Sequence, residues 1–210
     1  DVESRGLGDV YKRQVYQGEE LGMTNVAYPS IEDYDDIDTR NAYHTMIEEA
    51  ITPQEALAEA QRISRDNART PMQWDDSAYG GFSDHTPWLG VNPNYKEINA
   101  ASQMADDSSV FRFYQKLISL RKEHPVMAHG DLHLCCPEEG PVIAYTRSYQ
   151  EETLLAVHNF SQDVQKFQYA GTSLQPDTPV LLSNYPEQDI CPECEVLTLK
   201  PYETVIFQLS

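Results

Sequence analysis

Hydrophobic positions in the first part of the chain recur at helical spacing. A helix is predicted over residues 39–50 and a second over residues 52–64. The second begins at a capping sequence, in which Thr52 is followed by Pro53 at the first helical position and by Glu55 three residues after the cap. One apolar stripe along this helix consists of Leu57, Ala60 and Ile63.

A third helix is predicted to begin after residue 107 or 108 and to end at about residue 123. Asp107 or Ser108 is the expected N-cap, because both side chains can accept a backbone hydrogen bond. The apolar residues of its face are Val110, Phe113, Tyr114, Leu117 and Leu120. These side chains are expected to face a core.

From Gly130 onward the pattern changes to short alternating runs, separated by glycine, proline and aspartate. Such runs predict the strands of an antiparallel sandwich. The expected strands are 132–136, 142–149, 154–160, 166–169, 180–183, 196–199 and 204–209. Residues 1–14, in contrast, have neither alternation nor an apolar run, and resemble translated adapter sequence, so we expect them to be non-native.

The acidic composition limits the partners that this chain can have. Its 210 residues include 34 acidic and 15 basic residues, which gives a net charge of −19. This charge argues against binding to nucleic acid or to an anionic membrane, and neutral sugars suit such a surface better. No apolar run reaches the roughly 20 residues of a membrane span, and no secretory signal is visible, so we expect a cytoplasmic protein.

The four cysteines occur as one adjacent pair and one CxxC, namely Cys135, Cys136, Cys191 and Cys194. This grouping permits a zinc site or two disulfides. However, neighbours on a strand point to opposite faces, and the CxxC has no second CxxC. Free thiols in a reducing cytoplasm are the expected state, with no metal and no cofactor.

The segment from Ser64 to Trp74 holds the most varied polar side chains of the chain. Arg65 and Arg69 alternate here with acidic, amide and aromatic residues in neither strand nor helix spacing, and Pro71 prevents a helix from continuing. A loop that presents groups to a polar ligand has this composition. The alternative is a surface loop whose arginines pair with nearby carboxylates.

The sequence Arg-Asp-Asn-Ala-Arg-Thr-Pro-Met-Gln-Trp at residues 65–74 resembles the signature of the oligo-1,6-glucosidase and dextran glucosidase group of the α-amylase family. Residues 15–25, 87–99 and 199–209 continue the resemblance in order, so that it covers about residues 15–210. The resemblance implies an α/β fold followed by an all-β one. The chain would supply the C-terminal end of a (β/α)8 TIM barrel and then an antiparallel β-sandwich.

This resemblance also implies domain limits. Residues 15–128 would contain the last barrel strand at 15–17, a long active-site loop and the last barrel helix, and residues 129–210 would form the sandwich. Because active sites lie at the carboxyl ends of barrel strands, the loop that follows residue 18 is expected to be functional.

The resemblance implies retaining hydrolysis of α-glucosidic bonds in a small oligosaccharide. The family's three catalytic carboxylates lie before the last barrel strand, so no catalytic residue is expected in this chain. Arg65 matches the arginine that binds the glucose at the non-reducing end. Asp38 lies where the dextran glucosidases commonly have glutamate, on the leaving-group side, and Arg69 is interpreted as a structural ion-pair partner.

Two alternatives remain open from the sequence. A trehalose-6-phosphate hydrolase has a very similar loop but needs basic residues for its phosphate, against which the acidic run at residues 32–38 argues. The heavy-chain subunit of amino-acid transporters is a non-catalytic relative of the family. The presence of Arg65 and of Gly18-Glu19-Glu20 favours the enzyme.

Overall fold

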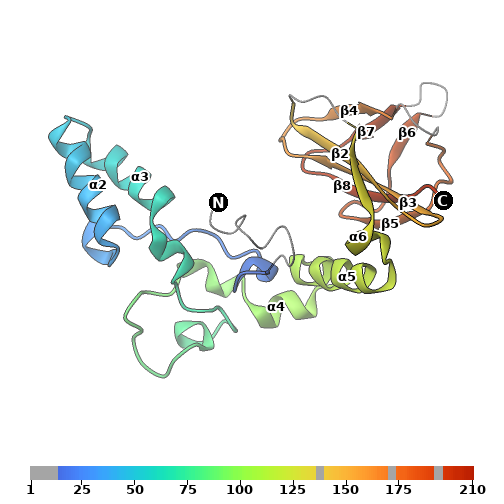
Figure 1. Cartoon of the computed structure of the whole chain (residues 1–210). Helices are drawn as coiled ribbons and strands as arrows, with labels where there is room; N and C mark the ends of the chain where they lie inside the picture. Colours follow the sequence, from blue (N-terminus) through green and yellow to red (C-terminus); the bar gives the residue numbers. More distant parts are fainter. Residues whose placement is uncertain (1–13, 136–139, 170–173, 192–195) are drawn as a thin grey trace. The chain divides into compact units, whose positions relative to one another are not determined.

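The computed structural model describes residues 14–135, 140–169, 174–191 and 196–210. The chain divides into two compact units, Asp1–Tyr114 and Gln115–Ser210, which we call the helical unit and the sandwich unit. Short helices make up the first, and two β-sheets make up most of the second (Figure 1). The prediction for residues 1–14 falls, except for Gln14, outside the described residues.

The helical unit contains both predicted helices of the long loop. They are α2 (Ile37–Glu48) and α3 (Pro53–Ile63), which pack against each other. The predicted cap of α3 is confirmed, because the Thr52 hydroxyl accepts a hydrogen bond from the Glu55 amide and the Glu55 carboxylate accepts one from the Thr52 amide. The unit also contains α4 (Ala100–Ala105) and 3-10 turns at Glu19–Leu21 (η1), Ile31–Asp33 (η2), Arg65–Ala68 (η3), Ala78–Gly81 (η4) and Pro93–Lys96 (η5).

A small core fixes the loop segments of the helical unit to α3. The rings of Tyr28 and Tyr34 meet edge to face at 5.0 Å, and the Tyr28 hydroxyl donates a 2.6 Å hydrogen bond to the carbonyl of Gly90. The buried members of this core are Val26, Tyr28, Ile31, Tyr34, Ala60 and Leu89. The loop that leads toward Asp36 and Asp38 therefore has a defined path.

Residues 15–17 do not form the predicted strand. The backbone is irregular up to Tyr16 and turns at Gln17 and Gly18, and η1 follows. A parallel strand exists only when it is hydrogen-bonded to a neighbour, and the described part of this chain contains no second barrel strand beside it.

Helix α5 (Val110–Glu123) confirms the third predicted helix but begins at a different cap. The Ser109 hydroxyl accepts the Arg112 amide at 3.2 Å, whereas both the amide and the hydroxyl of Ser108 bond to the Asp106 carboxylate. Asp106 thus holds Ser108 in the turn before the helix. The expected core face of α5 is not fully buried at any position, since the described residues include no barrel strands for it to cover.

The sandwich unit begins with the end of α5 and the short helix α6 (Val126–His129), and continues as two antiparallel sheets. The strands are β1 (Asp131–Leu134), β2 (Val142–Tyr149), β3 (Glu152–Asn159), β4 (Gln165–Gln168), β5 (Val180–Ser183), β6 (Asp189–Cys191), β7 (Val196–Leu199) and β8 (Thr204–Gln208). The first sheet has the order β1-β2-β3-β8-β5 and the second β4-β7-β6. All seven predicted strands are present, and β6 is additional.

One core lies between the two sheets, as expected for a sandwich. Phe167, Leu197 and Leu199 come from the three-stranded sheet. They share a buried cluster with residues of the five-stranded sheet, namely Ala144, Leu155, Val157, Val205 and Phe207. The predicted succession of a partial barrel domain and an antiparallel β domain is confirmed.

Candidate functional site

The candidate site is built on the turn that follows α3. The amide of Ser64 donates the last hydrogen bond of the helix, to the carbonyl of Ala60, and the Ser64 hydroxyl then accepts the amide of Asp66. This second contact caps η3, whose first residue is Arg65. Arg65 is therefore held at the junction of two helical turns by residues adjacent to it in sequence.

Two carboxylates connect this turn to the start of α2. Asp66 is completely buried, and its carboxylate accepts the amides of Asp35 at 2.7 Å and Asp36 at 3.0 Å. In the opposite direction, the Asp36 carboxylate accepts the Arg65 amide at 3.3 Å, its Nε at 3.0 Å and its Nη2 at 2.6 Å. Each segment thus supplies a carboxylate that binds the other.

Asp36 stays ionised in this environment. Burial by itself would raise the pKa of the Asp36 carboxyl, but hydrogen bonds from Arg65 and Thr39 outweigh burial and hold that pKa well below its usual range. The Thr39 hydroxyl donates its bond at 2.6 Å. Only 3% of the Asp36 side chain is exposed, so this is a buried charge with its partners in place.

The two residues predicted to bind substrate lie together. The Arg65 Nη2 is 2.7 Å from a carboxylate oxygen of Asp38, which belongs to the first turn of α2. Asp38 is 77% exposed and Arg65 54% exposed, so both are accessible to a ligand within this unit. The roles that we predicted for them remain predictions.

Our sequence interpretation missed Asp36. It occupies the N-cap position of α2, yet its side chain makes no cap hydrogen bond to the described helix backbone and binds Arg65 instead. The partner lies 29 residues away in sequence. The available signal was an aspartate at a helix start beside two further carboxylates, which cannot by itself identify a distant partner.

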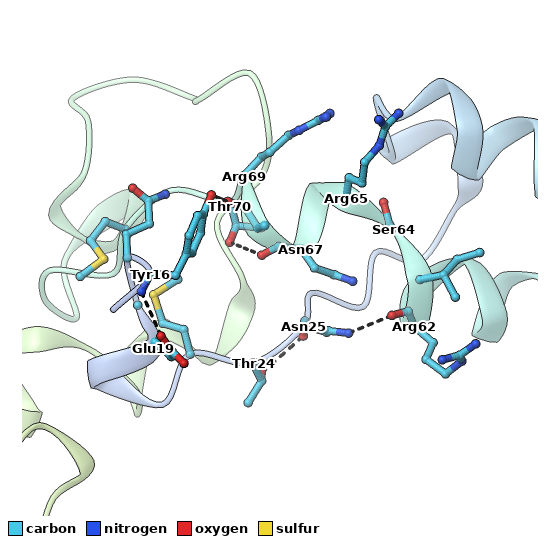
Figure 2. Close-up of a pocket in the computed structure, with 16 residues that line it drawn as sticks. Tyr16, Glu19, Thr24, Asn25, Arg62, Ser64, Arg65, Asn67, Arg69 and Thr70 are labelled. Atoms are coloured by element: carbon cyan, nitrogen blue, oxygen red, sulfur yellow. Dashed lines mark hydrogen bonds between the residues drawn. The ribbon is translucent and has the colours of Figure 1, made fainter. Parts of the chain in front are cut away.

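A cavity of about 760 Å³ lies beside the turn (Figure 2). One wall of the cavity is this turn, and the other is the segment that begins at Tyr16. The Tyr16 hydroxyl donates a hydrogen bond to the carbonyl of Ala68 at 2.9 Å. The side-chain amide of Asn25 also connects the two walls, because it donates a hydrogen bond to the carbonyl of Arg62. In Figure 2 the side chains of Arg65 and Arg69 extend from the turn, and Arg62 lies at the end of α3.

Each of the three arginines that line the cavity forms an ion pair. Arg62 pairs with Glu59 at 2.6 Å, Arg65 with Asp36 at 2.6 Å, and Arg69 with Asp66 at 3.3 Å. The interpretation of Arg69 as an ion-pair partner agrees with this contact. A surface loop whose arginines pair with nearby carboxylates would form the same ion pairs. The pairs therefore do not distinguish such a surface loop from a loop that binds a polar ligand.

The cysteine predictions lie largely outside the described residues. Cys136, Cys194 and the side chain of Cys191 fall outside the described part of the chain, and Cys135 is a free thiol. Within the described ranges, no group of three or more histidine, cysteine, aspartate or glutamate side chains is arranged to hold a metal ion. No described helix is both long enough and apolar enough to cross a membrane.

Two family descriptions match this chain, one after the other along the sequence. Residues 11–130 match the family described as "Alpha amylase, catalytic domain", and residues 142–206 match "Alpha-amylase SusG C-terminal domain". The first match alone covers more than half of the chain. The chain therefore belongs to the α-amylase family.

Among its relatives are two kinds of bacterial glucosidase. The oligo-1,6-glucosidase of Halalkalibacterium halodurans is 44% identical over 193 residues, which are 92% of this chain and 34% of that protein. The trehalose-6-phosphate hydrolase of Bacillus subtilis is 39% identical over 199 residues, 93% of this chain and 35% of that protein. The chain thus spans about a third of the length of the curated relatives it matches.

Solved structures agree with this assignment. The Bacillus licheniformis trehalose-6-phosphate hydrolase superposes with a TM-score of 0.83 at 36% identity, covering 92% of this chain and 35% of its own. A mutant of MutB in complex with its substrate sucrose gives a TM-score of 0.82 at 39% identity, covering 94% and 35%.

Proposed function

We propose that the protein containing this chain is a retaining, exo-acting α-glucosidase that hydrolyses α-1,6-glucosidic bonds of oligosaccharides. In this proposal Arg65 contacts the glucose at the non-reducing end, and Asp38 lies on the leaving-group side of the bond. The nucleophilic aspartate and the acid/base glutamate, which retaining enzymes place about 5 Å apart, would precede residue 15. The chain supplies one wall of the sugar site.

Within this family, the charge balance of the cavity is the observation that favours a neutral sugar substrate. Arg62, Arg65 and Arg69 are each paired with a carboxylate of the same unit. A guanidinium held in this way still presents hydrogen-bond donors to sugar hydroxyls, but its positive charge is already balanced. Such a wall suits an uncharged oligosaccharide.

Trehalose 6-phosphate is the competing substrate, because relatives that hydrolyse it are nearly as similar as the oligo-1,6-glucosidases. Its phosphate carries about two negative charges and binds best to cations that no carboxylate neutralises. Asp38 lies directly beside Arg65 and would repel a phosphate placed there. We therefore favour the neutral substrate.

The test is a comparison of substrates with the complete protein, expressed from its full coding sequence. We expect the highest kcat/KM on isomaltose, a lower one on maltose, and release of α-glucose as the first product by NMR, as retention requires. A higher kcat/KM on trehalose 6-phosphate than on isomaltose would contradict the proposal.

The 210-residue chain alone is the matched control. It should not hydrolyse p-nitrophenyl α-glucoside above background, because the proposal places both catalytic carboxylates outside it. Turnover by the isolated chain would show that they lie within it.

A further inference from the structure

Asp36 is a buried carboxylate to which the proposed function assigns no role. It lies at the N-cap position of α2, is 3% exposed, and receives both Nε and Nη2 of Arg65 on the same oxygen, Oδ1. Its second oxygen, Oδ2, accepts the Thr39 hydroxyl at 2.6 Å and the Arg65 amide at 3.3 Å. Both oxygens are therefore occupied by donors.

The position of this carboxylate is fixed independently of the Arg65 side chain. The backbone amides of Asp35 and Asp36 both donate to Asp66, which is completely buried and paired with Arg69. Thr39, buried one helical turn further on, orients the carboxylate itself. A buried, braced carboxylate can therefore locate a half-exposed guanidinium, and the reverse dependence is weaker.

Asp38 cannot do the same for Arg65. It contacts Nη2 only, at 2.7 Å, and 77% of its side chain is exposed. Exposed ion pairs fix side chains weakly, because solvent screens the attraction and the side chains keep alternative rotamers. Asp36 contacts the Nε and Nη2 edge, whose direction sets the plane of the whole guanidinium.

We propose that Asp36 is the positioning residue for Arg65, and that it aims the guanidinium at the sugar while Asp38 is left to contact the leaving group. This inference rests on the proposed function, in which Arg65 binds the non-reducing-end glucose. A misplacement of about 1 Å in a substrate-orienting group can reduce the rate roughly 10²-fold. Asp36 would thus affect turnover without touching the substrate.

A double-mutant cycle in the complete enzyme tests the inference, with kcat and KM measured on isomaltose for Asp36→Asn, Arg65→Ala and the double variant. We expect Asp36→Asn to lower kcat/KM roughly 10- to 100-fold, and to have less than about a threefold effect once Arg65 is alanine. Asp76→Asn, which removes an equivalent charge from an exposed position, is the control and should keep wild-type kinetics.

A second pair of variants covers the case in which Asp36→Asn does not fold. Thr39→Val removes the hydroxyl that orients the carboxylate but keeps the ion pair, and Thr39→Ser keeps both. We expect Thr39→Val to lower kcat/KM several-fold, Thr39→Ser to be nearly wild type, and the valine effect to disappear in the Arg65→Ala background. Thermal unfolding of each variant separates a loss of positioning from a loss of fold.

The outcomes distinguish the two proposals. If Arg65→Ala keeps wild-type kinetics, the proposed substrate role of Arg65 is wrong. If Arg65→Ala is impaired, but Asp36→Asn and Thr39→Val are as harmful without Arg65 as with it, then Asp36 acts only through the fold and the positioning inference alone is overturned.

Discussion

Arg147 of strand β2 binds the backbone carbonyl of Gly130 through two nitrogens, Nη2 at 2.8 Å and Nε at 3.2 Å. Its third nitrogen, Nη1, donates to the carbonyl of Met127 at 2.8 Å. Met127 belongs to the short helix α6, and Val126 of the same helix is completely buried. One charged side chain thereby satisfies carbonyls at the end of α6 and fastens this helix to the five-stranded sheet.

This contact leads to a prediction about the domain limit, which we expected at residue 129. A fragment of residues 115–210 should unfold at a higher temperature than one of residues 129–210, because the shorter one loses the burial of Val126 and the acceptor at Met127. Burial of one valine contributes about 1.5–3 kcal/mol. In a domain of this size, each kcal/mol of stability shifts the melting temperature by roughly 4–8 °C. Calorimetry on both fragments provides the measurement, and equal melting temperatures would support the limit at residue 129.

The core between the two sheets gives a second prediction. Leu155 is completely buried in the shared cluster, so Leu155→Ala should destabilise the sandwich unit by about 2–5 kcal/mol through lost burial and a residual cavity. Leu134→Ala makes the same chemical change on β1, where the side chain is 70% exposed, and should cost less than about 0.5 kcal/mol. Similar losses in both variants, measured by calorimetry, would contradict the sandwich core.

The sequence predicted what local patterns determine and missed what depends on distant partners. Alternation located seven strands, and Thr52 marked the start of α3 correctly, because both signals lie within a few residues. Strand β6, with only Asp189–Cys191, is too short to show alternation. The strand at residues 15–17 was expected from the family resemblance alone, and these residues have no partner strand within the described chain. The ion pair of Asp36 with Arg65 joins segments that only tertiary structure brings together.

The capping box of α3 gives a third prediction, since this helix leads directly into Arg65. Thr52→Ala removes the acceptor for the Glu55 amide and should destabilise the start of the helix by about 1 kcal/mol, whereas Thr52→Ser keeps the hydroxyl and should be nearly neutral. Hydrogen exchange at the Glu55 amide measures this locally and should become roughly fivefold faster in the alanine variant only. Unchanged exchange would mean that the cap does not hold the helix start.

The last prediction concerns the pH dependence of the helical unit. Because the folded pKa of Asp36 lies below the ordinary carboxyl value of about 3.9, the unfolded chain binds a proton there first as pH falls. The stability that Asp36 contributes is therefore fully present above about pH 5 and is lost as pH falls through the unfolded pKa toward the lower folded pKa. Asp36→Asn lacks this contribution at every pH.

Asp36→Asn should therefore be less stable than wild type by about 1–2 kcal/mol at pH 7, a value below that of a fully buried pair because Arg65 is half exposed. The difference should stay constant down to about pH 5 and shrink below about pH 4. Both tryptophans of the chain, Trp74 and Trp88, belong to the helical unit, so fluorescence during urea unfolding reports on that unit alone. Asp35→Asn, which changes an exposed neighbouring side chain, is the control and should differ much less from wild type in its free energy of unfolding at pH 7. If the difference between Asp36→Asn and wild type widens in acid, the predicted sign is wrong.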